Sequence, residues 1–259
     1  MKLLTLNVWG ATRGQVLFDY IREEAEDTDI FCFQEIFSAL PGAPEISSGG
    51  RMFLFQELSR MLPEFAGFYD PRSSEADFNG PIAQPISHGT AMFVRKNLEI
   101  LNYSAEIIEQ THNANDAAEG WTKAQVLKLE HLGGAFFVIN FHGVAQPGNK
   151  LDTPQRLAHA KRLRLIWDSL DGGKILCGDF NMYPEIESIK LLEERSRNLI
   201  KEFNVQNTRN NLSWAKYPGG RQTFADFTFV SSEIKVKNFE VPYNEVSDHL
   251  PMILEFDFH

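Results

Sequence analysis

Five apolar segments of this chain end abruptly in polar side chains, and this arrangement limits the folds that the sequence can adopt. A short apolar run is typical of a strand buried in the core. Polar groups just past such strands gather at one edge of a sheet, where α/β proteins place their sites. We therefore expect the five ends to meet. They are Leu6-Asn7, Phe33-Gln34-Glu35, Asn140-Phe141-His142, Gly178-Asp179-Phe180-Asn181 and Ser247-Asp248-His249.

The segments between these ends alternate between strand and helix patterns. Residues 2–8 and 29–34 predict strands around a helix, and residues 153–170 predict an amphipathic helix before a strand at 174–177. Each half of the chain thus repeats the order strand, helix, strand. Other strands alternate apolar and polar residues, as antiparallel strands with one covered face do. The pattern predicts an α/β fold, and because no linker divides residues 1–259, we expect a single domain.

The net charge and the two cysteines indicate which kinds of partner and which cell compartment suit this chain. The chain has 35 acidic and 25 basic side chains, and the net charge of -10 opposes non-specific binding to a duplex. Cys32 and Cys177 lie inside apolar runs, so we expect buried thiols and no disulfide. The N-terminal apolar run is too short for a signal peptide, and no stretch approaches the ~18 apolar residues of a membrane span. We expect a monomeric, cytoplasmic protein.

A carboxylate follows the apolar residues 31–33 at Glu35. An acid delivered by a buried strand needs a partner, because an unpaired buried charge is costly. Mg²⁺ prefers oxygen ligands and often uses only one or two protein carboxylates. We interpret Glu35 as a metal ligand; the alternative is an acid that caps a helix or forms a salt bridge.

Asp179 and Asn181 are two residues apart, a spacing that puts side chains on one face of a strand. Asp179 could orient or deprotonate an attacking water, and the Asn181 amide could donate to a phosphoryl oxygen. The alternative is an Asx turn after the strand, which the order Gly-Asp-x-Asn also suits. The four other polar strand ends favour the functional interpretation.

His249 needs a partner from outside its own segment, because its neighbour Asp248 is expected to point the other way. Asp226, a charged residue in an apolar strand, is the best candidate. A carboxylate beside an imidazole fixes its tautomer, and His142 supplies a second imidazole. Either histidine could stabilise charge that develops on phosphorus. Asn7 is expected to help by holding a metal-bound water or a carboxylate.

In their order and spacing these motifs resemble the endonuclease/exonuclease/phosphatase superfamily, which includes deoxyribonuclease I, abasic-site nucleases, neutral sphingomyelinases and inositol polyphosphate 5-phosphatases. The resemblance implies a four-layer αββα sandwich, in which two mixed, mostly antiparallel β-sheets pack face to face with helices on both outer faces. It also implies hydrolysis of a phosphoester by in-line water attack, with Mg²⁺ or Mn²⁺ as cofactor. The implied roles are Glu35, Asn7 and Asp248 near the metal, Asp179 at the water, Asn181 and His142 at the phosphate, and Asp226–His249 as the catalytic pair.

Some positions depart from the superfamily's pattern. Many relatives have Arg-x-Asp-Tyr where this chain has Phe224-Ala225-Asp226-Phe227, so a basic side chain and a phenol are missing. Trp9 stands where abasic-site nucleases usually carry an acid, which weakens that assignment. The acidic partner that some relatives provide for the second histidine is not evident.

The leading hypothesis is a metal-dependent phosphodiesterase, with nucleic acid as the substrate class. The alternative is a phosphatase, or a hydrolase of the phospholipid or inositol-phosphate type, that acts on a smaller phosphoester; the acidic charge favours it. A non-catalytic binding module on the same fold is a remote alternative, and the intact Glu35, Asp179, Asn181 and His249 argue against it.

Three loops, at residues 37–50, 71–87 and 204–221, are expected to border the site. Their aromatic residues could stack on bases or anchor the loops; they are Phe37, Phe78, Trp214 and Tyr217. Basic residues of the helix at 153–170 form either a cationic patch or an ordinary solvated face; they are Arg156, Lys161, Arg162 and Arg164.

Overall fold

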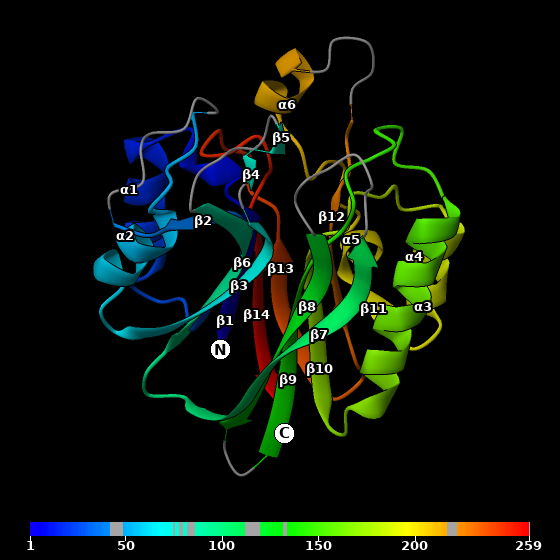
Figure 1. Cartoon of the computed structure of the whole chain (residues 1–259). Coiled ribbons are helices and arrows are strands. Elements are labelled where there is room, and N and C mark those ends of the chain that lie inside the picture. Colours follow the sequence, from blue (N-terminus) through cyan, green and yellow to red (C-terminus); the bar gives the residue numbers. More distant parts are fainter. Residues whose placement is uncertain are drawn as a thin grey trace.

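The computed structural model describes residues 1–41, 49–74, 76–77, 80–81, 86–111, 120–131, 134–216 and 222–258. Its main strands lie in two stacked sheets, with α1 and α2 outside one sheet and α3, α4 and α5 outside the other (Figure 1). The two sheets are joined at one edge, where Ser73 of β3 pairs with Gly120 of β8. The predicted four-layer αββα sandwich is confirmed.

The first sheet has the strand order β13-β14-β1-β2-β6-β3. Only β1 and β2 run parallel in it, and the other neighbours are antiparallel. Its strands are β1 (Lys2–Asn7), β2 (Ile30–Ala39), β3 (Phe65–Ser74), β6 (Ile86–Arg95), β13 (Ile234–Glu240) and β14 (Met252–Phe258). The segments on its outer side are the 3-10 turn η1 (Trp9–Ala11), α1 (Gln15–Glu24) and α2 (Leu54–Met61).

The second sheet has the order β7-β8-β9-β10-β12-β11, and here β9 and β10 form the parallel pair. Its strands are β7 (Glu99–Thr111), β8 (Gly120–His131), β9 (Gly134–His142), β10 (Gly173–Asp179), β11 (Arg197–Asn198) and β12 (Asp226–Val230). The helices are α3 (Pro154–Ser169), α4 (Glu187–Glu193), α5 (Leu199–Glu202) and α6 (Asn211–Lys216). A separate two-stranded ribbon joins β4 (Ala76–Asp77) and β5 (Gly80–Pro81).

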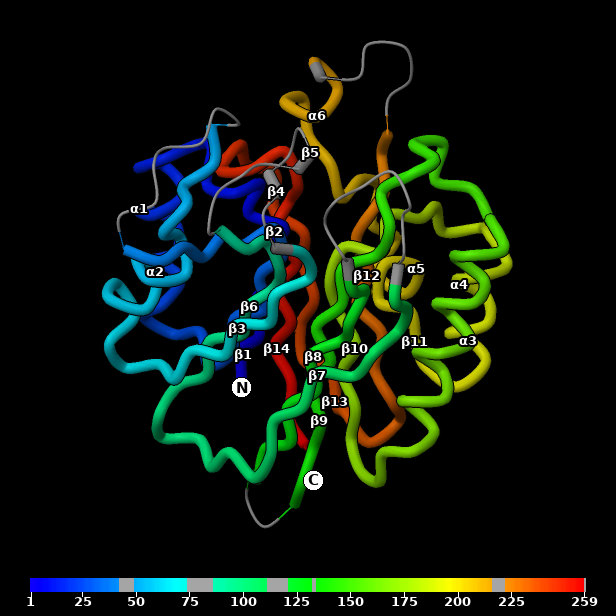
Figure 2. The backbone as a smooth tube through the Cα atoms, viewed as in Figure 1, coloured from blue at the N-terminus to red at the C-terminus, as the bar shows by residue number. Residues whose placement is uncertain are grey.

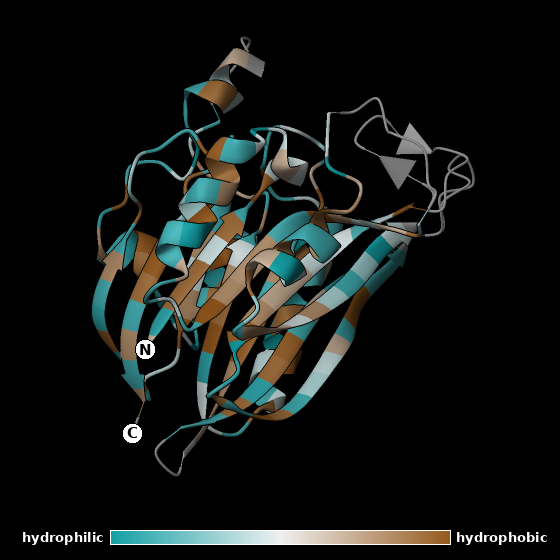
Figure 3. Cartoon of the chain, turned by 90° about the vertical axis from the view of Figure 1, so that its left-hand side faces the viewer, coloured by the Kyte–Doolittle hydropathy of each residue, from teal (hydrophilic) through white to brown (hydrophobic). Residues whose placement is uncertain are grey.

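Apolar strand residues build the core, as the sequence pattern predicted. Phe31 and Phe33 on β2 are fully buried, and their rings stack 5.2 Å apart. Hydrophobic residues colour much of the strands brown in Figure 3. Helix α3 begins at Pro154 after Thr153, whose hydroxyl accepts a hydrogen bond from the Arg156 backbone N–H at 3.1 Å. Proline at the first helical position and threonine at the cap favour this start.

The order strand, helix, strand occurs once in each sheet, as β1-α1-β2 and as β9-α3-β10. In the parallel pairs Asn7 lies opposite Gln34, and Asp179 lies opposite His142. Asp179 also faces Asp226 across the β10–β12 pair. These strand ends point to the upper edge of the molecule in Figure 2, away from the marked C terminus. The topology thus brings the polar ends of both sheets to one edge.

Buried amides connect the two sheets below that edge. Gln34 Nε2 on β2 donates to Asn140 Oδ1 on β9 at 2.7 Å. Asn140 Nδ2 in turn donates to Gln125 Oε1 at 2.9 Å and to the Phe33 carbonyl at 3.2 Å. Because buried polar groups are costly when unpaired, this cluster favours one alignment of the two sheets.

Cys32 and Cys177 are both buried and free, as predicted. In the described ranges, no helix combines the length and the hydropathy that crossing a membrane requires.

Candidate active site

Asp179, the last residue of β10, lies at the centre of the polar edge. Its Oδ2 accepts a hydrogen bond from Asn7 Nδ2 at 3.0 Å, and it lies 3.6 Å from His249 Nε2 and 3.7 Å from His142 Nε2. Gly178 permits this placement, because its φ is 132° and a Cβ there would overlap the carbonyl oxygen of Phe141. Burial alone would raise the pKa of Asp179, but the facing His249 and His142 hold it well below the usual range. The carboxylate therefore stays ionised.

Asn181 reaches the site through a turn and not through strand alternation. The strand ends at Asp179, and Asn181 has a φ of 57°, outside the range of a strand. Asp179 Oδ1 accepts the backbone N–H of Asn181 at 2.9 Å, which is the contact of an Asx turn. The expectation that strand spacing places the two residues on one face was therefore wrong, yet both side chains line the same pocket.

His249 and Asp226 form a buried pair. His249 Nδ1 lies 2.9 Å from each carboxylate oxygen of Asp226. Burial and the nearby Arg209 lower the pKa of His249, but Asp226, Asp179 and Asp248 outweigh them and raise it. The imidazole is thus held by one acid and presents Nε2 to another.

Glu35 leaves the regular strand at a β-bulge. The pairing of β2 with β6 shifts between Gln34 and Ile36, and Glu35 between them has a φ of 59°. A bulge re-aims the side chain of the extra residue. Here Glu35 Oε1 lies 4.0 Å from His142 Nε2, and burial together with the charge of Asp248 raises the pKa of Glu35.

Asn7 ends β1, and Asp248 lies just before β14, the strand that pairs with β1. Asn7 Oδ1 accepts the Trp9 backbone N–H at 3.0 Å, and the Ser247 hydroxyl donates to the Asn7 carbonyl at 2.6 Å. Asp248 Oδ2 accepts a hydrogen bond from Arg209 Nη2 at 2.8 Å. One oxygen of Asp248 is therefore already paired with a cation.

His142 is a neutral imidazole, because burial lowers its pKa to about 3. Its Nε2 faces Glu35 and Asp179, and among the described residues its Nδ1 has no hydrogen-bond partner. Within those residues, two groups bring ligand atoms within 4.8 Å of one another: Glu35, His142 and Asp179, and Asp179, Asp226 and His249.

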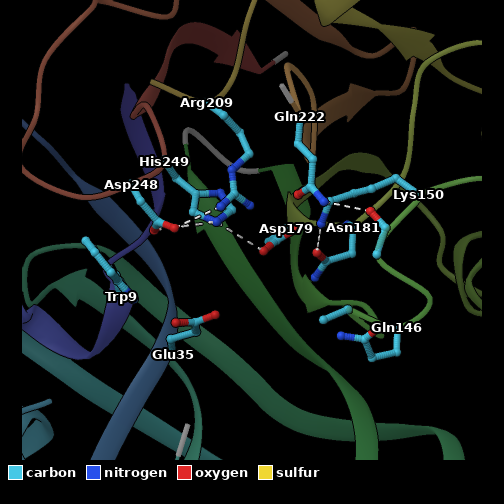
Figure 4. A pocket seen from close by; sticks show the side chains of 12 residues that line it. Trp9, Glu35, Gln146, Lys150, Asp179, Asn181, Arg209, Gln222, Asp248 and His249 are labelled. Carbon is cyan, nitrogen blue, oxygen red and sulfur yellow. Dashed lines mark hydrogen bonds and ion pairs between the residues drawn. The ribbon is translucent and has the colours of Figure 1, made fainter. Parts of the chain in front are cut away.

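A pocket of about 90 Å³ is lined by five of these residues, Glu35, Asp179, Asn181, Asp248 and His249 (Figure 4). Its lining does not include Asn7, His142 or Asp226. Figure 4 places Trp9 and Glu35 on one side, Lys150 and Asn181 on the other, and Asp179 between them. The rest of the lining comes from Ala145, Gln146, Gly148, Arg209 and Gln222.

A sequence model of the Endonuclease/Exonuclease/phosphatase family matches residues 4–249, nearly the whole chain. The chain belongs to the endonuclease/exonuclease/phosphatase family. A sequence search among curated proteins gives no match.

Solved structures with the family's fold are distant in sequence. An endonuclease/exonuclease/phosphatase from Bacteroides vulgatus has 19% identity and a TM-score of 0.71, with 100% of this chain and 98% of that chain covered. The human nocturnin catalytic domain with bound sulfate has 20% identity and a TM-score of 0.67, covering 100% and 93%. The mannosyl-6-phosphatase of Bacteroides thetaiotaomicron has 17% identity and a TM-score of 0.67, covering 100% of both chains. At these identities the likeness shows the shared fold.

Several residues of this family member's pocket were not predicted from its sequence. Lys150 and Arg209 are buried cations at the pocket, and Trp9 and Gln222 form part of its wall. Outside the pocket, Arg72 donates from Nη1 to the Gly143 carbonyl at 3.1 Å, next in sequence to His142. These five residues lie in irregular segments or at a strand's irregular end, where no periodic pattern marks them.

The expected loop features have mixed outcomes. Phe37 is a buried strand residue whose ring lies 4.8 Å from that of His88, so it does not stack on a substrate. Trp214 donates from Nε1 to the Gln222 carbonyl at 3.1 Å, which anchors a segment next to the pocket. Phe78 and Tyr217 lie outside the described residues, as do residues 42–48 and 82–85 of the predicted loops.

Neither the cationic patch nor the solvated face considered for this helix holds for Arg156, which is fully buried. Its guanidinium donates to backbone carbonyls, including those of Leu151 at 2.5 Å and Pro147 at 2.7 Å. Arg164 pairs with Asp168 at 3.0 Å. Sequence could not separate these cases, because burial of an arginine depends on the loop folded over it.

Proposed function

We propose that this chain is a divalent-metal-dependent hydrolase that cleaves a phosphoester by in-line attack of water. The observation that carries the proposal is the position of Asp179, an ionised carboxylate 3.6 Å from His249 Nε2 and 3.7 Å from His142 Nε2. An acid that faces two imidazoles and an amide in a pocket suits the activation of water next to a developing anion.

The residues present fit a hard divalent cation. Glu35, Asp179 and Asp248 bring carboxylates close enough that Asp248 and Asp179 both raise the pKa of Glu35. Among the described residues, no lysine or arginine forms an ion pair with Glu35. Oxygen donors suit Mg²⁺ or Mn²⁺, which Glu35, Asn7 and the Asp248 oxygen not bound by Arg209 would hold. When bound, the ion would offset negative charge on the phosphoryl group.

The protein's own groups would divide the remaining work. Asp179 accepts a proton from the attacking water as its oxygen bonds to phosphorus, and the ester P–O bond breaks. The leaving oxygen takes a proton from solvent. Asp226 fixes the tautomer of His249. His249 and the amide of Asn181 both face the pocket, where they stabilise the phosphoryl oxygens. His142, a neutral imidazole, contributes from Nε2 on the other side.

A phosphodiester in nucleic acid is the first candidate substrate. Its support comes from the sequence motifs and from Trp9, an indole in the pocket wall that suits stacking on a base. As part of the same proposal, the chain acts as one domain and as a cytoplasmic monomer.

A smaller phosphoester is the second candidate, and the charge of the chain favours it. The net charge of -10 disfavours a long polyanion. One solved structure of the same fold is a mannosyl-6-phosphatase.

A substrate panel with Mg²⁺, Mn²⁺ and a chelator tests the proposal. It would compare plasmid, single-stranded DNA, RNA, inositol phosphates, sphingomyelin and sugar phosphates, each with the native chain and with Asp179→Asn. We expect hydrolysis of at least one substrate that the chelator and the substitution both abolish. Metal-independent hydrolysis, or full activity in Asp179→Asn, would refute the mechanism.

A further inference from the structure

Lys150 is a buried cation for which the proposed mechanism has no use. The side chain is 3% exposed and lines the pocket beside Asp179 and Asn181. Its Nζ donates to Asn181 Oδ1, and no carboxylate of the described residues forms an ion pair with it. A buried ammonium group without an ion partner costs free energy, so a fold retains it where an anion can arrive.

The surrounding loop holds Lys150 in place. Lys150 has a φ of 59°, and its carbonyl accepts the backbone N–H of Tyr183 at 3.1 Å. The buried guanidinium of Arg156 donates to the carbonyls on both sides of it, at Pro147 and Leu151. A rigid loop removes the entropic cost of positioning a flexible lysine, which is what a preorganised binding group needs.

A second buried cation shares the pocket. Arg209 is 5% exposed and pairs with Asp248, and among the described residues its Nε has no hydrogen-bond partner. Burial lowers the pKa of Lys150, and the charge of Arg209 lowers it further while Asp179 raises it. An anion between the two cations would relieve this repulsion.

We propose that Lys150, with Arg209, selects a phosphoryl group that carries two negative charges, as in a terminal phosphate, over the singly charged phosphodiester. Lys150 has two further N–H donors beyond the one on Asn181, so it can bind an oxygen that a diester would carry as an alkyl ester. Because Lys150 Nζ donates to Asn181 Oδ1, the Nδ2 end of the Asn181 amide points away from Lys150. Nδ2 can then donate to other acceptors, such as the Gly143 carbonyl. This inference rests on the proposed function.

The test compares two substrates with the same leaving group, 4-nitrophenyl phosphate and bis(4-nitrophenyl) phosphate, on the Mg²⁺-loaded chain at a pH where the monoester is a dianion. A charge-assisted hydrogen bond is worth about 10- to 100-fold in affinity. Lys150→Met should therefore lower kcat/KM for the monoester by about 10- to 100-fold and change that for the diester by less than about threefold. Lys150→Gln keeps a donor for Asn181 but has no charge. It should also lower kcat/KM for the monoester relative to that for the diester. The control is Lys190→Met, at an exposed position of α4, which removes one charge away from the pocket.

A binding measurement keeps the inference separate from the chemistry. Calorimetry with inorganic phosphate and dimethyl phosphate should show tighter binding of phosphate to the native chain, and Lys150→Met should lose that preference. If neither ester is hydrolysed while phosphate binding depends on Lys150, the proposed function fails and the selective subsite stands. If Lys150→Met does not fold, the affinities of the native chain for phosphate and for dimethyl phosphate still test the inference.

Equal losses on both esters would overturn the inference, as would a native chain that binds dimethyl phosphate as tightly as phosphate. Two further substrates distinguish the sources of a terminal phosphate: a 5′-phosphorylated oligonucleotide and glucose 6-phosphate. Release of phosphate from either substrate supports the inference. The substrate that is hydrolysed faster shows whether the terminal phosphate belongs to a nucleic acid or to a sugar.

Discussion

His249 Nδ1 lies 2.9 Å from both carboxylate oxygens of Asp226, a residue 23 positions earlier in the chain. A carboxylate in this position requires Nδ1 to carry the proton, so the opposite nitrogen, Nε2, is the one presented to Asp179. The pair is fully enclosed, with both side chains 3% exposed. Its integrity can therefore be tested without disturbing the surface.

Asp226→Asn should lower kcat for phosphoester hydrolysis by about 10²- to 10⁴-fold, the range that positioned acid–base groups contribute. The amide keeps the volume of the acid but can present a donor to the imidazole, which favours the wrong tautomer. His249→Ala should cost at least as much. Steady-state kinetics with circular dichroism as a check of folding measures both, and near-normal turnover in a folded variant would contradict the assignment.

Glu35→Gln should weaken binding of Mg²⁺ and Mn²⁺ by about tenfold or more, since even groups outside the ligand shell often cost that much. Calorimetry measures the affinity directly. The native chain should also gain about 2.7 kcal/mol of stability at a metal concentration of 100 Kd, and the variant should gain less. Glu99→Gln, an exposed acid on β7, is the matched control. Equal metal affinity in the two variants would remove Glu35 from the ligand set.

Asn140→Ala should destabilise the fold by about 2–4 kcal/mol, because Gln34 Nε2, Gln125 Oε1 and the Phe33 carbonyl each lose a buried hydrogen bond. Urea unfolding reports the change as a lower midpoint. Asn102→Ala, an exposed amide on β7, should change the free energy of unfolding by no more than about 0.5 kcal/mol. Similar values for the two would mean that the amides do not fix the alignment of the sheets.

Acid should destabilise the chain partly through His88. Burial, with the charge of Arg72, lowers the pKa of this histidine from 6.5 to about 3 in the folded state. Between these values the unfolded chain binds the extra proton and the folded chain does not, so stability falls as the pH decreases. The loss between pH 7 and pH 5 is about 2 kcal/mol for one such group.

His88→Phe keeps a ring against Phe37 and removes the titrating group. Its free energy of unfolding should therefore change less between pH 7 and pH 5 than that of the native chain. Denaturant titrations at the two pH values measure the difference. An unchanged pH dependence would show that His88 is protonated alike in both states.

The fold could be predicted because the strands and helix α3 carry strong patterns. The apolar run 175–177 ends at Asp179, and the run 31–33 leads to Glu35, so both the strands and their polar ends are visible in the sequence. The pairing of His249 with Asp226 was also predictable, because a lone acid in an apolar strand needs a partner.

Lys150, Arg209 and Arg156 could not be found in the same way. Each lies in or beside an irregular segment, where a lysine on a loop is indistinguishable from a solvated one until the chain packs over it. The turn at Asn181 and the bulge at Glu35 escaped for a related reason. Both interrupt the alternation from which strand faces are predicted, and both occur where the side chain is re-aimed into the pocket.

The neighbouring positions of β1 and β14 have a consequence for the synthesis of this protein. The first strand carries Asn7, while His249 lies three residues before the start of the last strand, which pairs with the first through Leu4 and Ile253. A nascent chain on the ribosome holds Glu35, His142 and Asp179 long before the imidazole of His249 emerges from the exit tunnel. Truncated translation products should therefore be inert toward phosphoesters, because the site is completed only when the two ends of the chain meet.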